Sequence, residues 1–230
     1  MQRNLFYTAV GNLATKRAGF DGKYPVIVIN RRENIVDPQE FAVWSILCWR
    51  IYDPEELSML YADIAPSLPP AKRTLESCVM RLETRGLIAK GVGDTEFEAL
   101  YDLLSDLYVA PVAETFSLRF AAFLKLVFLS GVSLGKAAEL FRRDRRDKRE
   151  AQVMALSNQA LLSTAELIKC TEAGITDIST EEKLLDALYS DEDTTSDNIG
   201  MMMLTAKARE SVTAAVANLY LRKQIVLERI

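Results

Sequence analysis

Two Asp-Pro pairs near the start of the chain constrain the fold more than any other feature. In Asp37-Pro38-Gln39-Glu40 and Asp53-Pro54-Glu55-Glu56, an aspartate suited to the N-cap precedes a proline suited to the first helical position. A glutamate follows each aspartate three residues later, which is the spacing of a capping box. Residues 65–70, Ala-Pro-Ser-Leu-Pro-Pro, end the second helix because proline cannot continue the hydrogen-bond ladder. The chain is therefore restricted to short helices in this region.

A third short helix is predicted from about Ala71 to Arg85, with Gly86 where a left-handed C-terminal cap is favoured. Residues 87–89 follow as a strand, and the β-branched run at 24–29 predicts another strand. Three short helices and an immediate strand are the order of a winged helix-turn-helix. The inner stripe of the third helix consists of Leu75, Cys78, Val79 and Leu82.

The run from Arg81 to Ile88, Arg-Leu-Glu-Thr-Arg-Gly-Leu-Ile, resembles the end of the recognition helix in MarR-like and PadR-like bacterial regulators. The resemblance covers residues of about 36–112. It implies a sequence-specific DNA-binding transcriptional regulator, or a control protein of a mobile element, that uses a winged helix. One departure is a capping box at Thr95 and Glu98, which predicts a helix inserted in the wing before a returning strand at 108–112.

Helical signals dominate the second half of the chain. We therefore predict a mainly α protein with a small β-element: a winged helix-turn-helix domain over 1–112, followed by an all-helical bundle over 113–230 for dimerisation or partner binding. The predicted helices of the bundle are 116–130, 133 to about 169, 180–189 and 200–229.

The third helix carries the predicted DNA-binding residues, because in a helix-turn-helix its first residues meet base edges while nearby basic residues hold phosphates. These residues are Lys72, Arg73, Thr74, Ser77, Arg81 and Arg85. Double-stranded DNA is the predicted partner. Glu76, on the same side, favours an alternative in which the winged helix docks onto a protein partner and binds no DNA.

The densest basic run predicts a secondary polyanion patch, since four arginines share one face if the run is helical. They are Arg142, Arg145, Arg146 and Arg149. An alternative is a solvated helix face, because Asp144 and Asp147 can pair with basic neighbours one turn away.

Residue usage argues against an enzyme and for a cytoplasmic protein. The chain has no histidine, which excludes Ser-His-Asp triads and histidine zinc sites. Its three cysteines have no short spacing, so we expect buried thiols, no metal and no cofactor. A net charge of −4 means that DNA binding needs a local basic patch. We expect no signal peptide, no membrane contact, and a homodimer formed through the small-residue stripe from Leu204 to Leu219.

Overall fold

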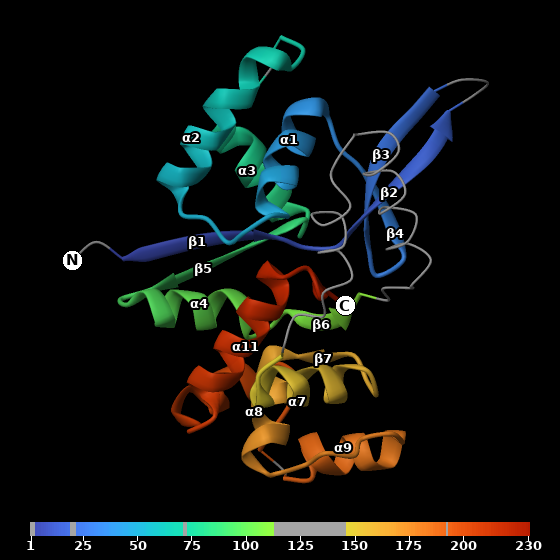
Figure 1. The fold of residues 1–230 in the computed structure, drawn as a ribbon, viewed down its shortest axis with the longest axis vertical. Helices are drawn as coiled ribbons and strands as arrows, with labels where there is room; N and C mark the ends of the chain where they lie inside the picture. Colours follow the sequence, from blue (N-terminus) through green and yellow to red (C-terminus); the bar gives the residue numbers. More distant parts are fainter. Residues whose placement is uncertain (1–2, 19–21, 71–72, 113–145, 192) are drawn as a thin grey trace, which may run out of the picture.

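The computed structural model describes residues 3–18, 22–70, 73–112, 146–191 and 193–230. Within these ranges, eight strands form three small sheets among the helices (Figure 1). The protein is therefore mixed α/β, and the prediction of a mainly α fold with a small β-element is wrong. In the described residues, no helix has the length and apolar character that a membrane span requires.

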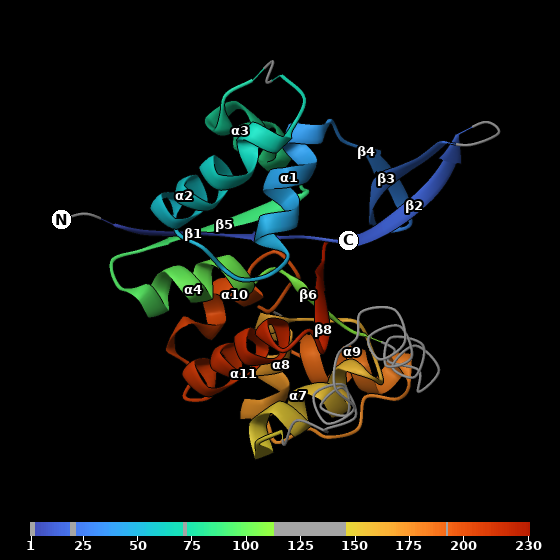
Figure 2. The ribbon, with the colours of Figure 1, turned by 45° about the horizontal axis from the view of Figure 1, so that its top comes forward.

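The first sheet pairs the two ends of the first half of the chain. Strand β1 (Asn4–Ala9) runs antiparallel to β5 (Ile88–Gly93), and Tyr7 forms an isolated bridge with Tyr52 on its other side. The predicted strand at 24–29 is confirmed as β3. It belongs to a second antiparallel sheet, which extends away from the helices (Figure 2). The strands of that sheet are β2 (Asn12–Ala18), β3 (Gly22–Ile29) and β4 (Arg32–Ile35).

The three predicted short helices of the first half are confirmed. Asp37 and Glu40 form the expected capping box, and Asp53 accepts hydrogen bonds from two backbone N–H groups of the following turn. Gly86 adopts the expected left-handed conformation, with a φ of 69°. The elements are α1 (Pro38–Leu47), α2 (Pro54–Ile64), the 3-10 turn η1 (Ala65–Ser67) and α3 (Leu75–Thr84).

The predicted wing is not formed. The capping box of Thr95 and Glu98 does open helix α4 (Glu96–Leu104), but β5 pairs with β1 and not with the strand at 108–111. The physical reason is the docking of α4 on β5. A Cβ atom on Gly91 would lie 2.2 Å from the carbonyl oxygen of Ala99, so glycine permits an approach that no other residue allows. Helix α4 thereby carries the chain to the opposite face of the β1–β5 sheet (Figure 1).

The second half is not an all-helical bundle. A third sheet has the order β7 (Leu162–Ser163), β6 (Tyr108–Pro111) and β8 (Ile225–Glu228). The part of the predicted helix 133–169 that is described divides at β7, and the predicted helix 200–229 ends before β8. The helices are α7 (Lys148–Ser157), α8 (Thr164–Glu172), α9 (Glu181–Tyr189), α10 (Ile199–Met202) and α11 (Arg209–Leu221), with the 3-10 turn η3 (Met203–Thr205). The predicted helix 116–130 lies outside the described residues.

The two halves repeat one topology, which was not predicted from the sequence. In the first half, β1 lies between the bridge to Tyr52 and β5, which follows the last helix. In the second half, β6 lies between the short strand β7 and β8, which also follows the last helix. The bridge of Tyr7 to Tyr52 corresponds to the pair Val109 and Leu162. We call β1, α1–α3 and β5 the first unit, and β6, α7, β7, α8, α11 and β8 the second unit.

Local details of the two units also correspond. The capping box of Asp37 and Glu40 opens α1, and an identical box of Asp147 and Glu150 opens α7. Asp53 caps α2, and Ser163, at the same spacing from the box, caps α8. The match in strand register, caps and helix order indicates an internal duplication.

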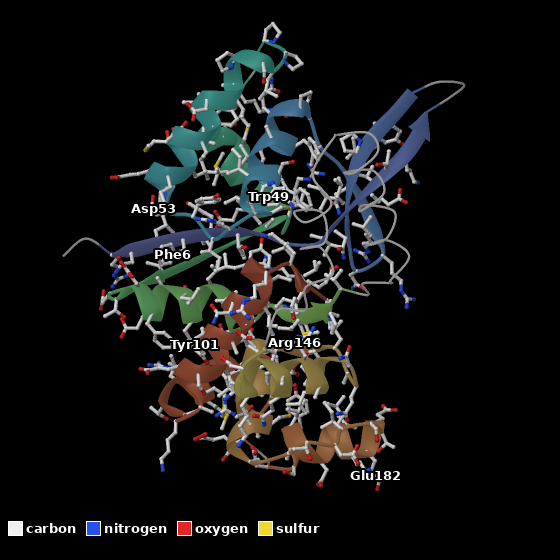
Figure 3. The ribbon with its side chains drawn as sticks, in the orientation of Figure 1. Phe6, Trp49, Asp53, Tyr101, Arg146 and Glu182 are labelled. Atoms are coloured by element: carbon white, nitrogen blue, oxygen red, sulfur yellow. The ribbon has the colours of Figure 1, made fainter. Side chains whose placement is uncertain are left out.

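Each half of the molecule has its own hydrophobic core. The first core lies between α1, α2, α3 and the β1–β5 sheet. The second core contains residues of α4 and β6 together with α7, α8 and α11. Figure 3 shows the two sides, with Asp53 at the start of α2 and Tyr101 on α4 across the sheet. The predicted domain boundary at 112 and 113 remains a prediction.

Candidate functional site

The third helix of the first unit begins later than predicted. Its N-cap is Thr74, whose hydroxyl accepts a hydrogen bond from the backbone N–H of Ser77. Arg73 therefore precedes the helix and does not lie in its first turn, and Lys72 is outside the described residues. The predicted inner stripe is confirmed, with Cys78 and Leu82 fully buried.

The arginines of this region pair with carboxylates of α1. Arg73 bonds to Asp37, and the Nε of Arg81 lies 2.5 Å from Glu40 Oε1. Arg85 Nη1 lies 3.3 Å from Glu40 Oε2, and Arg85 Nη2 donates to a backbone carbonyl of β4 at 2.7 Å. The Glu40 side chain is only 2% exposed, so two arginines compensate a buried charge. The predicted basic cluster exists but is partly neutralised.

The outward side of α3 remains open and chemically mixed. Thr74, Met80, Arg81 and Thr84 are exposed, and Ser77 is half-buried. Glu76 is exposed on the same helix, and hydrogen bonds from its own backbone and from Thr74 lower its pKa. This carboxylate is therefore ionised at neutral pH and opposes an approaching phosphate.

The corresponding helix of the second unit, α11, is covered. It packs against α4 as well as α7 and α8, and only one narrow face, with Ala214, Asn218 and Leu221, is exposed. The Tyr220 hydroxyl donates to the carbonyl of Leu47 at 2.8 Å. Lys223 Nζ donates to the carbonyls of Cys48 and Trp49 at 2.6 and 2.7 Å. The end of α11 thus binds the C-terminal carbonyls of α1 and joins the two units.

The small-residue stripe on α11 is part of this core. Val212, Ala215, Val216 and Leu219 are each at most 2% exposed. These four side chains cannot form a dimer seam while the chain is folded, whereas Leu204, where the predicted stripe begins, is 44% exposed. The homodimer remains a prediction.

The predicted secondary patch is only partly described, since Arg142 and Arg145 lie outside the described residues. Arg146 precedes α7 and its Nε donates to Gln224 at 2.5 Å, whereas Arg149 lies within α7 and donates to Gln152 at 2.7 Å. Because the helix begins at Lys148, Arg146 and Arg149 do not share a helix face. The physical reason is the N-cap at Asp147, which starts the helix after Arg146.

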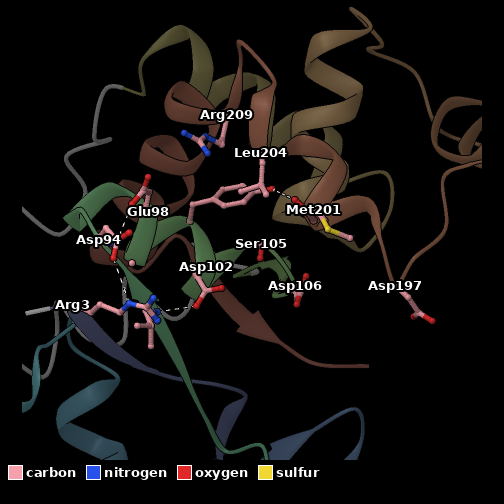
Figure 4. Close-up of a pocket in the computed structure, with 14 residues that line it drawn as sticks. Arg3, Asp94, Glu98, Asp102, Ser105, Asp106, Asp197, Met201, Leu204 and Arg209 are labelled. Atoms are coloured by element: carbon pink, nitrogen blue, oxygen red, sulfur yellow. Dashed lines mark hydrogen bonds and ion pairs between the residues drawn. The ribbon is translucent and has the colours of Figure 1, made fainter. Parts of the chain in front are cut away.

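An open cleft of about 630 Å³ lies where β5, α4 and α10 meet (Figure 4). Arg209 contributes to the cleft, and its guanidinium stacks over Phe97 and Tyr101 at 5.2 and 5.4 Å from the ring centroids. Arg3 pairs with Asp94 at its edge. The remaining charged lining is acidic and consists of Asp94, Glu98, Asp102, Asp106 and Asp197. The end of β5, where a wing would project, is therefore negative.

Several features of the site were not predicted. The residues missed are Glu40 and Glu150 as buried ion-pair partners, and Arg31, Arg32 and Arg229 as exposed cations beside the first unit. The repeated Asp-x-x-Glu spacing at 37–40 and 147–150 was the available signal for the duplication. In the described part of the chain, no group of three His, Cys, Asp or Glu side chains could hold a metal ion.

Comparisons with family models, with curated proteins and with solved structures find no match to this chain. Its function is therefore inferred from the geometry alone.

Proposed function

We propose that this chain is a DNA-binding regulator that contacts duplex DNA through the outward side of α3. One observation carries the proposal: of the two equivalent third helices, α11 is packed against α4, α7 and α8, whereas α3 has an open outward side. Only Cys78 and Leu82 are buried on α3. In helix-turn-helix proteins this helix enters the major groove.

The ion pairs are compatible with a role in DNA recognition. Arg81 uses its Nε for Glu40, and a guanidinium has five N–H donors in a fixed fork. The Arg81 side chain is 44% exposed. Glu40 therefore holds the guanidinium in one orientation while other donors face solvent. A fixed donor loses less conformational entropy when it binds a base edge or a phosphate.

The acidic cleft limits the contact to one side of the unit. Asp94 and Glu98 lie at the end of β5, where the wing of such a domain would meet phosphate. Like charges repel at that point, so the wing position contributes nothing to affinity. Binding is expected to rely on α3 and its immediate neighbours.

A second candidate function is docking of α3 onto a protein, without DNA binding. The paired arginines and the 62% exposed Met80 on the outward side favour it. An exposed methionine adapts to an apolar partner surface. The same experiment decides between the two functions.

The test is selection of duplexes from a random pool by the purified full chain, followed by fluorescence anisotropy with the selected and a scrambled duplex. An Arg73→Ala, Arg81→Ala variant should lose the preference for the selected duplex by about tenfold or more. An Arg50→Ala, Lys207→Ala variant removes the same charge elsewhere and should keep it. Thermal unfolding confirms that both variants fold. If the wild-type chain enriches no sequence and binds no duplex at low salt, the DNA function is rejected in favour of protein docking.

A further inference from the structure

The first unit, the β2–β4 sheet and β8 meet at one junction. The backbone N–H of Gly11 donates to the carbonyl of Leu227 at 2.8 Å. The Asn12 side chain donates to Glu228 at 2.7 Å, and the backbone of Asn30 also hydrogen-bonds to the Glu228 carboxylate. Arg229 follows directly, and its Nη1 lies 3.6 Å from the point that a Cβ on Gly86 would occupy. Three segments distant in sequence are thus held together.

Four arginines lie within two residues of these contacts. Arg31 and Arg32 follow Asn30, Arg85 precedes Gly86, and Arg229 follows Glu228. Arg31, Arg32 and Arg229 are exposed, and the Arg85 side chain is half-buried. We call this group the arginine junction. Arg85 is the C-cap of α3, so the junction lies at the C-terminal end of the helix assigned above to DNA.

The turn that presents Arg31 has an unusual backbone. Asn30 and Arg31 have φ values of 45° and 61°, as in the two-residue hairpin turn that favours Asn-Gly. Arginine in the second position adopts a left-handed conformation that glycine would adopt without cost. Residues held at such a cost cluster at functional sites.

The carboxylates near the junction are engaged within the protein. Glu40 is buried and shared by two arginines, and Glu33 pairs with Lys16. Glu228 is half-buried and bonded to Asn12 and Asn30, and burial raises its pKa. The exposed guanidinium groups therefore dominate the charge that a partner in solution would meet.

We propose that the arginine junction binds the phosphodiester backbone of duplex DNA beside the segment that α3 reads. The proposal rests on the proposed function and adds the residues that supply affinity without sequence preference. Arginine suits this role because its planar fork matches phosphate oxygens. Contacts to phosphate position a protein on the duplex, and contacts to bases specify the sequence.

The test compares two variants of the full chain by fluorescence anisotropy with a random-sequence duplex over a range of salt concentrations. Arg31→Gln, Arg32→Gln, Arg229→Gln should reduce the slope of log K against log salt by about 0.9 for each phosphate that the variant no longer neutralises. A variant with lysine at the same three positions should keep most of the slope. The matched control, Arg50→Gln, Lys148→Gln, Lys207→Gln, removes three other exposed charges and should leave the slope unchanged.

Each outcome separates the two proposals when the selected duplex is titrated in parallel. If the glutamine variant keeps the wild-type slope, the arginine junction is overturned and the role of α3 stands. A reduced slope in a protein without sequence preference supports the junction and overturns reading by α3. If the wild-type chain binds neither duplex, both proposals are overturned.

Discussion

Lys223 occupies in the second unit the position that Gly86 occupies in the first. Their φ values are 58° and 69°, and each follows the C-cap of a third helix. The backbone bonds are equivalent: Gly86 and Leu87 donate to Glu83 and Leu82, and the corresponding N–H groups of Lys223 and Gln224 donate to Tyr220 and Leu219. Lysine in a left-handed conformation indicates that its side chain has a task that glycine could not perform.

The two hydrogen bonds from Lys223 Nζ to the carbonyls of Cys48 and Trp49 are expected to stabilise the contact between the units. Lys223→Met removes two hydrogen bonds, to the carbonyls of Cys48 and Trp49, and keeps the backbone strain, so it should lower the free energy of unfolding by about 2 kcal/mol. Lys223→Gly loses the same bonds but relieves about 1 kcal/mol of strain. Urea denaturation should therefore rank wild type above Lys223→Gly, and Lys223→Gly above Lys223→Met.

Fluorescence provides a local control for this ranking. Lys223 Nζ lies 5.6 Å from the centroid of the Trp49 ring, which is 68% exposed at the end of α1 (Figure 3). Both variants should change the native emission of Trp49. Equal stability of the two variants would contradict the assigned backbone strain.

The buried glutamates Glu40 and Glu150 both pair with arginines, but we expect their replacement to lower the free energy of unfolding by different amounts. Glu40 compensates two arginines, while Glu150 receives Arg222 Nη1 at 2.9 Å. Glu40→Gln should lower the free energy of unfolding by about 2 kcal/mol, below the cost of breaking a fully buried pair because the arginines are partly exposed. Glu150→Gln should cost less. Urea denaturation of the two variants checks this order, and a larger loss for Glu150→Gln would refute it.

Asp191 is expected to confer stability that is lost in acid. Lys169 Nζ donates to its carboxylate at 2.6 Å, and this bond, together with one from Thr194, lowers the pKa of Asp191 from 3.8 to about 2. A lowered pKa in the folded state means that the unfolded chain binds more protons between these values. The contribution is therefore complete above pH 3.8 and disappears as the pH falls towards 2.

Thermal unfolding of wild type and Asp191→Asn should show this dependence. The wild type should have the higher Tm near neutral pH, and the difference should vanish once the pH falls to the lowered pKa of Asp191. A difference in Tm that does not change with pH would show that the ion pair is not its source.

The cysteines are expected to be unreactive until the protein unfolds. All three are free thiols, and burial raises the pKa of Cys48 to about 12 and that of Cys170 to about 11. Burial also raises the pKa of Cys78. The reactive thiolate is therefore scarce at about pH 8. A disulfide reagent such as DTNB should label the chain slowly in buffer and fully in urea, and rapid labelling of the native protein would contradict the burial.

Local signals in the sequence predicted local structure well. The caps at Asp37, Asp53 and Thr95 and the left-handed turn at Gly86 each depend on residues within four positions, and all are confirmed. The break between α7 and α8 depends instead on the pairing of Leu162 with β6. A helical pattern of apolar residues does not reveal strand pairing between residues distant in sequence. The long helices predicted at 133–169 and 200–229 were therefore wrong where β7 and β8 form.

In the candidate site, too, local features were predicted from the sequence and long-range contacts were not. The position of the basic residues on and before α3 followed from the helical pattern. Their neutralisation could not be predicted, because Glu40 and Arg81 are 41 residues apart and meet only through the packing of α1 on α3. Such pairs decide how much positive charge remains for a partner, so charge counted along the sequence overstated the basic patch.

The register of β1 against β5 places Asn4 opposite Gly93, and that of β6 against β8 places Tyr108 opposite Glu228. In each unit the last strand pairs antiparallel with the first strand of the same unit, so the two ends of the unit lie side by side. The first unit can therefore be rewritten as one contiguous stretch, 37–93 joined by a short turn to 4–9, with the pairing of β1 to β5 and the bridge of Tyr7 to Tyr52 retained. In that order residue 37 becomes the N-terminus and residue 9 the C-terminus, so the segment with β2, β3 and β4 is an insertion and does not contribute to the pairing of the first unit's own strands.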